Sequence, residues 1–132
     1  MVMTQSQYEE YAEAFSRAED KSLLFENYYH PDIVFFHPYK GTFEGKNALV
    51  AFWNSGENAG HDGVRERLHV QNFMSNEDKV AVELKIEWSC FKDTEYLGPR
   101  KTGEVFWGNC AAFYELTNGK FSKVQLYLNL VE

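Results

Sequence analysis

The sequence predicts an α+β domain in which a cone-shaped, curved and mainly antiparallel sheet packs against three N-terminal helices. Apolar residues recur at helical spacing in the N-terminal part of the chain, whereas from about residue 64 the apolar period changes to two. Short polar turns separate the later segments, so consecutive strands are expected to pair antiparallel. Helices grouped at the start must then cover one face of that sheet. The 132 residues are expected to form one domain, residues 1–132.

The first two helices are expected before residue 30. Thr4 can cap the first helix, because Gln7 three residues later completes a capping box. A second, shorter helix can start at Asp20 or Ser22 and continue through residue 28. The first helix carries one apolar stripe at helical spacing, formed by Tyr8, Tyr11, Ala12, Phe15 and Ala18.

Residues 30–38 are expected to bring a titratable side chain to the end of a buried strand. Residues 30–32, His-Pro-Asp, favour a turn, because proline presets φ and aspartate bonds its own backbone. Residues 33–36 are an apolar run of β-branched and aromatic side chains, which indicates a buried strand. The strand is expected to stop at Pro38, which cannot donate a ladder hydrogen bond. His37 then lies at its end, in a position suited to chemistry.

A loop and a third helix are expected next. Gly41 and Gly45 indicate the loop. Residues 46–54 favour a helix, and the residues that follow, 54–63, are rich in glycine and asparagine and favour another loop. One face of the helix carries the apolar residues Ala48, Leu49, Phe52 and Trp53.

Four long strands are expected in the second half of the chain, over residues 64–74, 79–91, 104–116 and 121–131. The second has the clearest alternation, with apolar residues at every second position from Val80 to Cys90. Asn118-Gly119, between the last two strands, is the strongest short hairpin signal. The four strands are therefore expected to form a meander.

Aromatic residues make up 17% of the chain, with eleven Phe, eight Tyr and three Trp. Side chains of this kind need apolar surroundings, which a concave pocket or a subunit interface would supply. Trp107, Ala111 and Phe113 alternate on one face of the strand over 104–116, where a sheet covered on a single side would expose them. We therefore expect a homodimer formed through the outer face of the sheet.

Charge and cysteine usage exclude several classes of partner. A net charge of −7 without a basic run argues against nucleic acid and anionic membranes. The sequence shows neither a secretory signal nor a long apolar span nor a lipidation motif, so a soluble cytoplasmic protein is expected.

Cys90 and Cys110 match no metal spacing and are expected as buried reduced thiols, with a disulfide as the alternative if their strands pair. The four histidines also lack metal-ligand spacing, so no metal site is expected.

Four segments of the chain resemble the nuclear transport factor 2-like superfamily, whose fold is also described as cystatin-like. They are Tyr-His-Pro-Asp-Ile-Val-Phe-Phe-His-Pro at 29–38, Gly-Lys-Asn-Ala-Leu at 45–49, Asp-Lys-Val-Ala-Val at 78–82 and Thr-Asn-Gly-Lys at 117–120. Within the superfamily the chain is most similar to the SnoaL-like polyketide cyclases and ketosteroid isomerase. The resemblance covers nearly the whole chain and implies an apolar pocket inside the cone.

The resemblance also implies two site residues. In ketosteroid isomerase an Asp followed by Pro is the general base, and here His37 precedes Pro38 at that position. A Tyr on the family's first helix donates to the developing oxyanion, and Tyr11 falls close to it. The family's second donor, a protonated Asp on a later strand, falls near Ala112, which cannot donate. This departure argues against steroid isomerisation and leaves a Tyr–His pair facing an apolar cavity.

Each candidate residue has a second interpretation. His37 suits a general acid or base because its ordinary pKa lies near neutrality, but a strand-end histidine can also simply bond a backbone carbonyl. Tyr11 is either an oxyanion donor or a core aromatic. His69 is expected outside the pocket, opposite Leu68 and Val70, unless a bulge reverses the register. The expected pocket residues are Phe35, Trp53 and Trp88, with Tyr28, Cys110 and Tyr114 as weaker candidates.

Two functional classes follow. The first is a cofactor-free acid–base enzyme of the isomerase, cyclase or dehydratase type, acting on a small apolar carbonyl compound in an enclosed pocket. In this class His37 shuttles the proton and Tyr11 holds the enolate oxygen. The alternative is a non-catalytic small-ligand-binding or accessory domain, because one fold hosts many functions.

Overall fold

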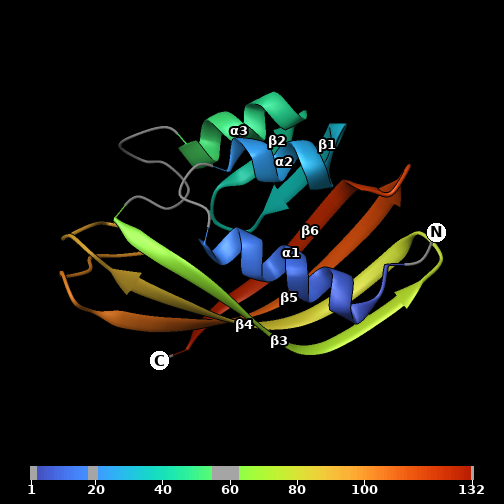
Figure 1. The fold of residues 1–132 in the computed structure, drawn as a ribbon. Helices are drawn as coiled ribbons and strands as arrows, with labels where there is room; N and C mark the ends of the chain where they lie inside the picture. Colours follow the sequence, from blue (N-terminus) through green and yellow to red (C-terminus); the bar gives the residue numbers. More distant parts are fainter. Residues whose placement is uncertain (1–2, 18–20, 55–62, 132) are drawn as a thin grey trace.

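The computed structural model describes residues 3–17, 21–54 and 63–131, which form three helices and one six-stranded sheet (Figure 1). The predicted α+β fold is confirmed, with the helices on the concave side of a curved sheet. The helices are α1 (Gln5–Arg17), α2 (Ser22–Tyr28) and α3 (Lys46–Asn54). The strands are β1 (Tyr29–His37), β2 (Gly41–Glu44), β3 (Val64–Asn76), β4 (Lys79–Cys90), β5 (Val105–Thr117) and β6 (Lys120–Val131).

The sheet has the strand order β2-β1-β6-β5-β4-β3. Strands β3 to β6 pair antiparallel in sequence order, which confirms the predicted meander. β1 returns to pair parallel with β6, and β2 pairs antiparallel with β1. The N-terminal strands thus extend the sheet beyond β6, so that β1 and β3 lie far apart in strand order yet face each other across the cone.

Helix α1 starts at the predicted capping box and is tied to β3. The backbone N–H of Gln7 donates to Oγ1 of Thr4 at 3.1 Å, and the backbone N–H of Thr4 donates to Oε1 of Gln7 at 2.8 Å. Near the other end of the helix, the Ser16 hydroxyl donates to the carbonyl oxygen of Ala12 and accepts the backbone N–H of Leu68 on β3. The helix buries Tyr8, Tyr11, Ala12 and Phe15 against the sheet.

The expected turn at residues 30–32 is wrong, since these residues belong to β1. The pairing of β1 with β6 has a register shift between Tyr29 and Val34, and Pro31 falls inside it. Proline cannot donate to a ladder, so an irregular stretch is where a strand tolerates it. The strand ends at His37, directly before Pro38, as predicted.

The loop expected from Gly41 to Gly45 is also wrong, because it contains the strand β2. Residues 38–40 turn the chain back so that Gly41 pairs with His37, and the short strand is held by this pairing rather than by its own composition. Helix α3 begins and ends at the predicted residues. Most of the loop expected after it, residues 55–62, lies outside the described residues.

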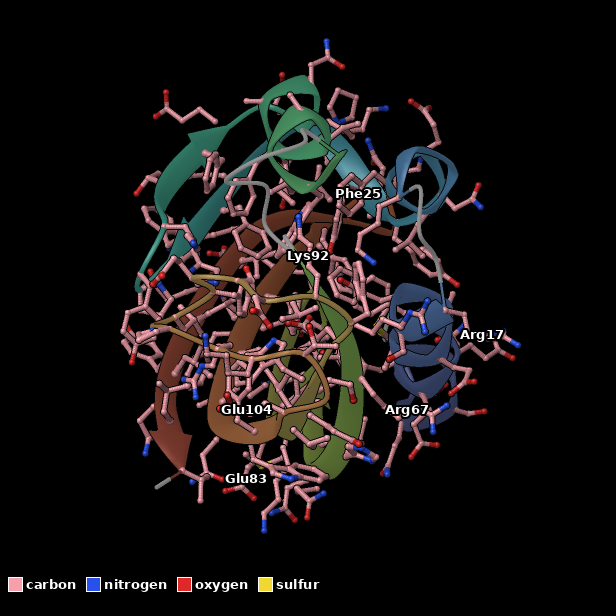
Figure 2. All side chains as sticks on the ribbon, turned by 90° about the vertical axis from the view of Figure 1, so that its left-hand side faces the viewer. Arg17, Phe25, Arg67, Glu83, Lys92 and Glu104 are labelled. Carbon is pink, nitrogen blue, oxygen red and sulfur yellow. The ribbon has the colours of Figure 1, made fainter. Side chains whose placement is uncertain are left out.

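The two faces of the sheet differ throughout the meander. On the inner face, below the helices, β4 buries Val80, Val82, Leu84, Ile86, Trp88 and Cys90. On the outer face, Figure 2 shows the labelled Glu83 pointing away from the molecule, whereas Phe25 lies between helices and sheet. Cys90 and Cys110 are free and buried, as expected. The β5–β6 hairpin turns at Asn118 and Gly119, with φ of 53° and 77°, as this dipeptide predicts.

Candidate functional site

A cavity of about 50 Å³ lies between the helices and the inner face of the sheet. Its wall includes Tyr11 of α1, Trp53 of α3, His37 of β1 and Glu66 of β3. Because the sheet curves, side chains from strands far apart in its order meet at this one cavity. Most of the remaining wall is aliphatic or aromatic, so the few polar groups define its chemistry.

The structure brings together most of the residues that the sequence singled out. His37, Tyr11, Phe35, Trp53, Trp88, Cys110 and Tyr114 all line the cavity. Tyr28 is the exception, since it was expected at the pocket but does not line this cavity. Its ring packs against Tyr11 from another side, in a separate hollow that Asn27 and Leu116 also line. Tyr28 ends α2 and Tyr29 begins β1, and the chain turns Tyr29 inward in its place.

His37 is held by the turn that follows it. Its side chain is 8% exposed, and the backbone N–H groups of Tyr39 and Lys40 both donate to its Nδ1, at 3.1 and 3.2 Å. An imidazole nitrogen that accepts N–H groups carries no proton, so the neutral ring bears its proton on Nε2. These bonds favour His37 as a hydrogen-bond donor through Nε2. This role differs from both interpretations of the sequence, a general base that accepts a proton and a histidine bonded to a backbone carbonyl.

The Tyr11 hydroxyl is hydrogen-bonded to the hydroxyl of Tyr29. Burial, followed by the charges of neighbouring groups, raises the pKa of Tyr11 well above its ordinary value. The hydroxyl is therefore a neutral donor at physiological pH. Two hydroxyls that share one internal hydrogen bond retain a second O–H, so the pair can still donate to a bound oxygen.

A second tyrosine pair lies beside the first. The hydroxyls of Tyr8 and Tyr114 are 2.6 Å apart, and their rings pack edge to face at 5.5 Å. Burial is the largest cause that raises the pKa of both hydroxyls. Burial also raises the pKa of the Cys110 thiol to about 12, so this thiol is protonated and unreactive at neutral pH.

Glu66 is a cavity residue that the sequence reasoning missed. The indole N–H of Trp88 donates to its Oε2 at 2.8 Å, and the two residues are direct partners across β3 and β4. Period-two spacing places Glu66 on the same face as Leu68, so the signal was present in the sequence. A single carboxylate on an otherwise apolar face is the feature that could have revealed it.

His69 lies on the outer side of β3, as expected. Its Nε2 is 3.0 Å from Oε1 of Glu87, and its ring centroid is 5.5 Å from that of Trp107. The β3–β4 pairing does contain a register shift, but it lies between Val70 and Asn72, beyond His69. His30 lies at the surface, where its Nδ1 accepts the backbone N–H of Asp32, and His61 lies outside the described residues.

A larger hollow, of about 710 Å³, lies on the outer face of the sheet. Its charged groups form surface ion pairs, in which Glu115 lies 3.2 Å from Lys79 and 3.5 Å from Lys123. Such exposed pairs leave no desolvated group for chemistry. The inner cavity is therefore the candidate site, although it is smaller. Among the described residues, we find no grouping of three His, Cys, Asp or Glu that could hold a metal, and none of the helices could cross a membrane.

The cone of sheet and helices around this cavity defines a nuclear transport factor 2-like protein. A family model described as the SnoaL-like domain matches residues 8–124, and the chain belongs to this family. Among proteins with curated descriptions, none gives a significant match.

Solved structures share the fold over nearly the whole chain. A candidate polyketide cyclase from Pseudomonas putida KT2440 is 24% identical with a TM-score of 0.74, and the match covers 96% of this chain and 92% of that chain. A candidate SnoaL-like polyketide cyclase from Jannaschia sp. CCS1 is 15% identical with a TM-score of 0.69, covering 94% and 86%. An LEH-like epoxide hydrolase from M. tuberculosis is 11% identical with a TM-score of 0.64, covering 91% and 80%. At these identities the likeness establishes the fold alone.

Proposed function

We propose that the protein is a cofactor-free acid–base enzyme of the isomerase, cyclase or dehydratase type, acting on a small apolar carbonyl compound. The observation that carries the proposal is that His37 and Tyr11 line one largely apolar cavity. In such surroundings a hydrogen bond to a developing oxyanion is worth far more than in water. In this proposal the Nε2–H of His37 and the second O–H of the Tyr11–Tyr29 pair hold that oxygen.

The cavity volume limits the substrate. A cavity of about 150 Å³ holds benzene in an engineered apolar site, whereas this cavity measures about 50 Å³. In this conformation the site accepts a ligand of a few non-hydrogen atoms. A multi-ring polyketide would require the aromatic wall to move, so we infer a substrate close to a simple ketone or aldehyde in size.

The second candidate function is binding without catalysis. It is favoured by the internal pairing of the tyrosine hydroxyls, since groups that satisfy one another also serve a stable core. The two candidates differ in what His37 contributes. In a binding site the shape of the His37 side chain matters, whereas in an enzyme the proton on its ring takes part in the reaction.

The test is His37→Asn, assayed by deuterium exchange into small enolisable ketones such as acetone and butanone. The asparagine oxygen can accept the two backbone N–H groups that Nδ1 now accepts, so the turn is retained. Asparagine has no N–H at the position of Nε2, and loss of one donor to a developing oxyanion typically slows turnover about 100- to 1,000-fold. We expect a loss of that order with little change in melting temperature. A variant that melts lower yet exchanges at the normal rate would favour the binding function.

We also propose a homodimer through the outer face of the sheet. Trp107, Phe113 and Tyr127 are 37%, 48% and 59% exposed there, and the last two rings pack edge to face. Exposed aromatic clusters of this kind mark interfaces. Sedimentation equilibrium should give twice the 15.4 kDa of one chain, and Phe113→Asp should return the mass to that of the monomer. A monomer at micromolar concentration would contradict the proposal.

A further inference from the structure

Glu66 is the carboxylate of the cavity wall. It is partly buried, it lines the cavity together with His37, and its Oε2 accepts the indole N–H of Trp88 at 2.8 Å. Trp88 is itself only 1% exposed, so this hydrogen bond holds the carboxylate from the floor of the sheet. A carboxylate oriented in this way by a rigid partner is suited to accept a proton from a bound molecule.

The charge of Glu66 affects titratable groups on several elements around the cavity. After burial, which is the larger cause, it raises the pKa of Tyr11 on α1, Tyr29 on β1 and Cys110 on β5. It also raises the pKa of Lys21, whose net shift is downward to about 8 because burial dominates. Its charge also raises the pKa of Tyr8 and Tyr96, again after burial, and both hydroxyls are neutral near pH 7.

His37 is poorly placed to be the base. To take up a second proton at Nδ1, the ring would lose the hydrogen bonds that Tyr39 and Lys40 donate to it. The neutral ring offers Nε2–H, which is a donor. A neutral histidine donor combined with a glutamate base is a known arrangement for moving a proton next to a carbonyl.

We propose that Glu66 is the proton acceptor of this site and that His37 is the hydrogen-bond donor to the substrate oxygen. The proposal deepens the proposed function and rests on it. Glu66 takes a proton from the carbon next to the carbonyl, and the C–H electron pair becomes the new C=C bond. The carbonyl π pair moves to the oxygen, which the Nε2–H of His37 stabilises. The protonated Glu66 then returns the proton to carbon, so atoms and electrons balance.

The substrate class follows from this arrangement. The carboxylate repels anions, and a dry cavity disfavours any ligand charge that it does not pair. The small volume excludes large ring systems in this conformation. The substrate is therefore an uncharged ketone or aldehyde with an enolisable C–H bond.

The experiment compares Glu66→Gln with Glu83→Gln in the ketone exchange assay. Glutamine keeps an oxygen for the Trp88 N–H but cannot accept a proton near neutral pH. We expect exchange to fall about 100- to 10,000-fold in Glu66→Gln. Glu83 lies exposed on the outer face of β4, so Glu83→Gln should exchange as the wild type does. The acid limb of the pH–rate profile should disappear with Glu66.

Two further measurements separate this inference from the proposed function. Nitrogen NMR should find His37 protonated on Nε2 and not on Nδ1 at neutral pH. His37→Asp should stay as slow as His37→Asn, because neither shorter side chain has an N–H at the position of Nε2. Normal exchange in Glu66→Gln, together with recovery in His37→Asp, would make His37 the base and overturn the inference while the proposed function stood. Absence of wild-type exchange with both acetone and butanone would overturn both.

Discussion

Strand β5 has two apolar faces, of which one is buried and the other is exposed. Cys110, Ala112 and Tyr114 point inward and are buried, whereas Trp107 and Phe113 point outward and remain substantially exposed. Packing within one chain explains the first set, because the helices cover the inner face. It leaves the second set unexplained, and an apolar surface that the fold does not cover is the usual sign of a partner. The comparison therefore separates residues that the fold of one chain buries from residues that only the proposed dimer would bury.

Polar groups differ between the two faces in the same way. On the inner face, hydroxyls pair with hydroxyls, as Tyr8 does with Tyr114. On the outer face, Glu115 pairs with Lys79 and Lys123 at the surface. The inner groups are buried in their neutral forms, whereas the outer groups are charged and screened by water. A rise in pH should therefore destabilise the protein through the buried hydroxyls of the inner face.

Alkaline pH should produce the largest effect. Burial raises the pKa values of Tyr8, Tyr11, Tyr29 and Tyr114 in the folded state above the unfolded value of about 10. Stability is present below that value and is lost as pH rises above it, because the unfolded chain releases these protons first. Each such group contributes about 1.4 kcal/mol per pH unit. The loss, measured by denaturant unfolding between pH 8 and 11, should exceed that of any single substitution.

Three variants sharpen this prediction. The lowered pKa of Lys21, about 8, acts in the opposite direction, because between pH 8 and the unfolded value of 10.5 the unfolded chain binds more protons. Through Lys21, stability therefore rises with pH within that window, as the cost of burying its charge is relieved, and Lys21→Met should remove this rise and make the alkaline loss of stability steeper. Tyr114→Phe should reduce the alkaline slope, while Tyr127→Phe on the outer face should not. An equal change for Tyr114→Phe and Tyr127→Phe would remove the distinction between the faces.

Two tryptophans provide the next comparison. Trp88→Ala empties a site that is 1% exposed and also removes the donor to Glu66, so unfolding should become easier by about 3–5 kcal/mol. Trp107→Ala on the outer face should cost the monomer less than about 1 kcal/mol. Denaturant unfolding at two protein concentrations measures both. If the outer face forms a dimer, the cost of Trp107→Ala should grow with concentration, whereas that of Trp88→Ala should not.

An effect smaller than that of Trp88→Ala is expected at Gly108. A Cβ added there would lie 2.7 Å from the Trp88 ring and 3.0 Å from Leu128, closer than packed atoms allow. Gly108→Ala should therefore destabilise the protein by about 1–3 kcal/mol, measured by thermal or denaturant unfolding. The matched control is Asn109→Ala, on the exposed face of the same strand. A neutral Gly108→Ala would show that the inner wall can shift, and would weaken the size limit placed on the substrate.

The sequence predicted those features that local chemistry determines. The Thr4–Gln7 capping box, the Asn118-Gly119 turn and the bounds of α3 follow from residues near in the chain. Strand β2 was missed because its pairing partner, rather than its composition, makes it a strand. The turn expected at residues 30–32 was wrong because an irregular pairing with β6 accommodates Pro31 inside β1.

The candidate site was predictable in part. The family resemblance implied that His37 and Tyr11 face one cavity, and both residues line it in the structure. Which ring nitrogen of His37 carries the proton depends on the backbone of Tyr39 and Lys40, and no sequence pattern specifies that. Glu66 shares a face with Leu68 by simple alternation, but a carboxylate on an apolar face is easily taken for a surface residue.

The hydrogen bond between Ser16 and the backbone of Leu68 has a consequence for how copies of the molecule can meet. β3 ends the sheet, and its unpaired backbone groups could otherwise recruit a strand from another chain. Helix α1 lies along this strand and occupies one of those groups, while the opposite edge is β2, which has only four residues. Strand addition is therefore hindered where α1 meets β3, and β2 offers only a short template. In the dimer that we propose, copies would instead meet through the outer face of the sheet, where contacts can close into a finite assembly.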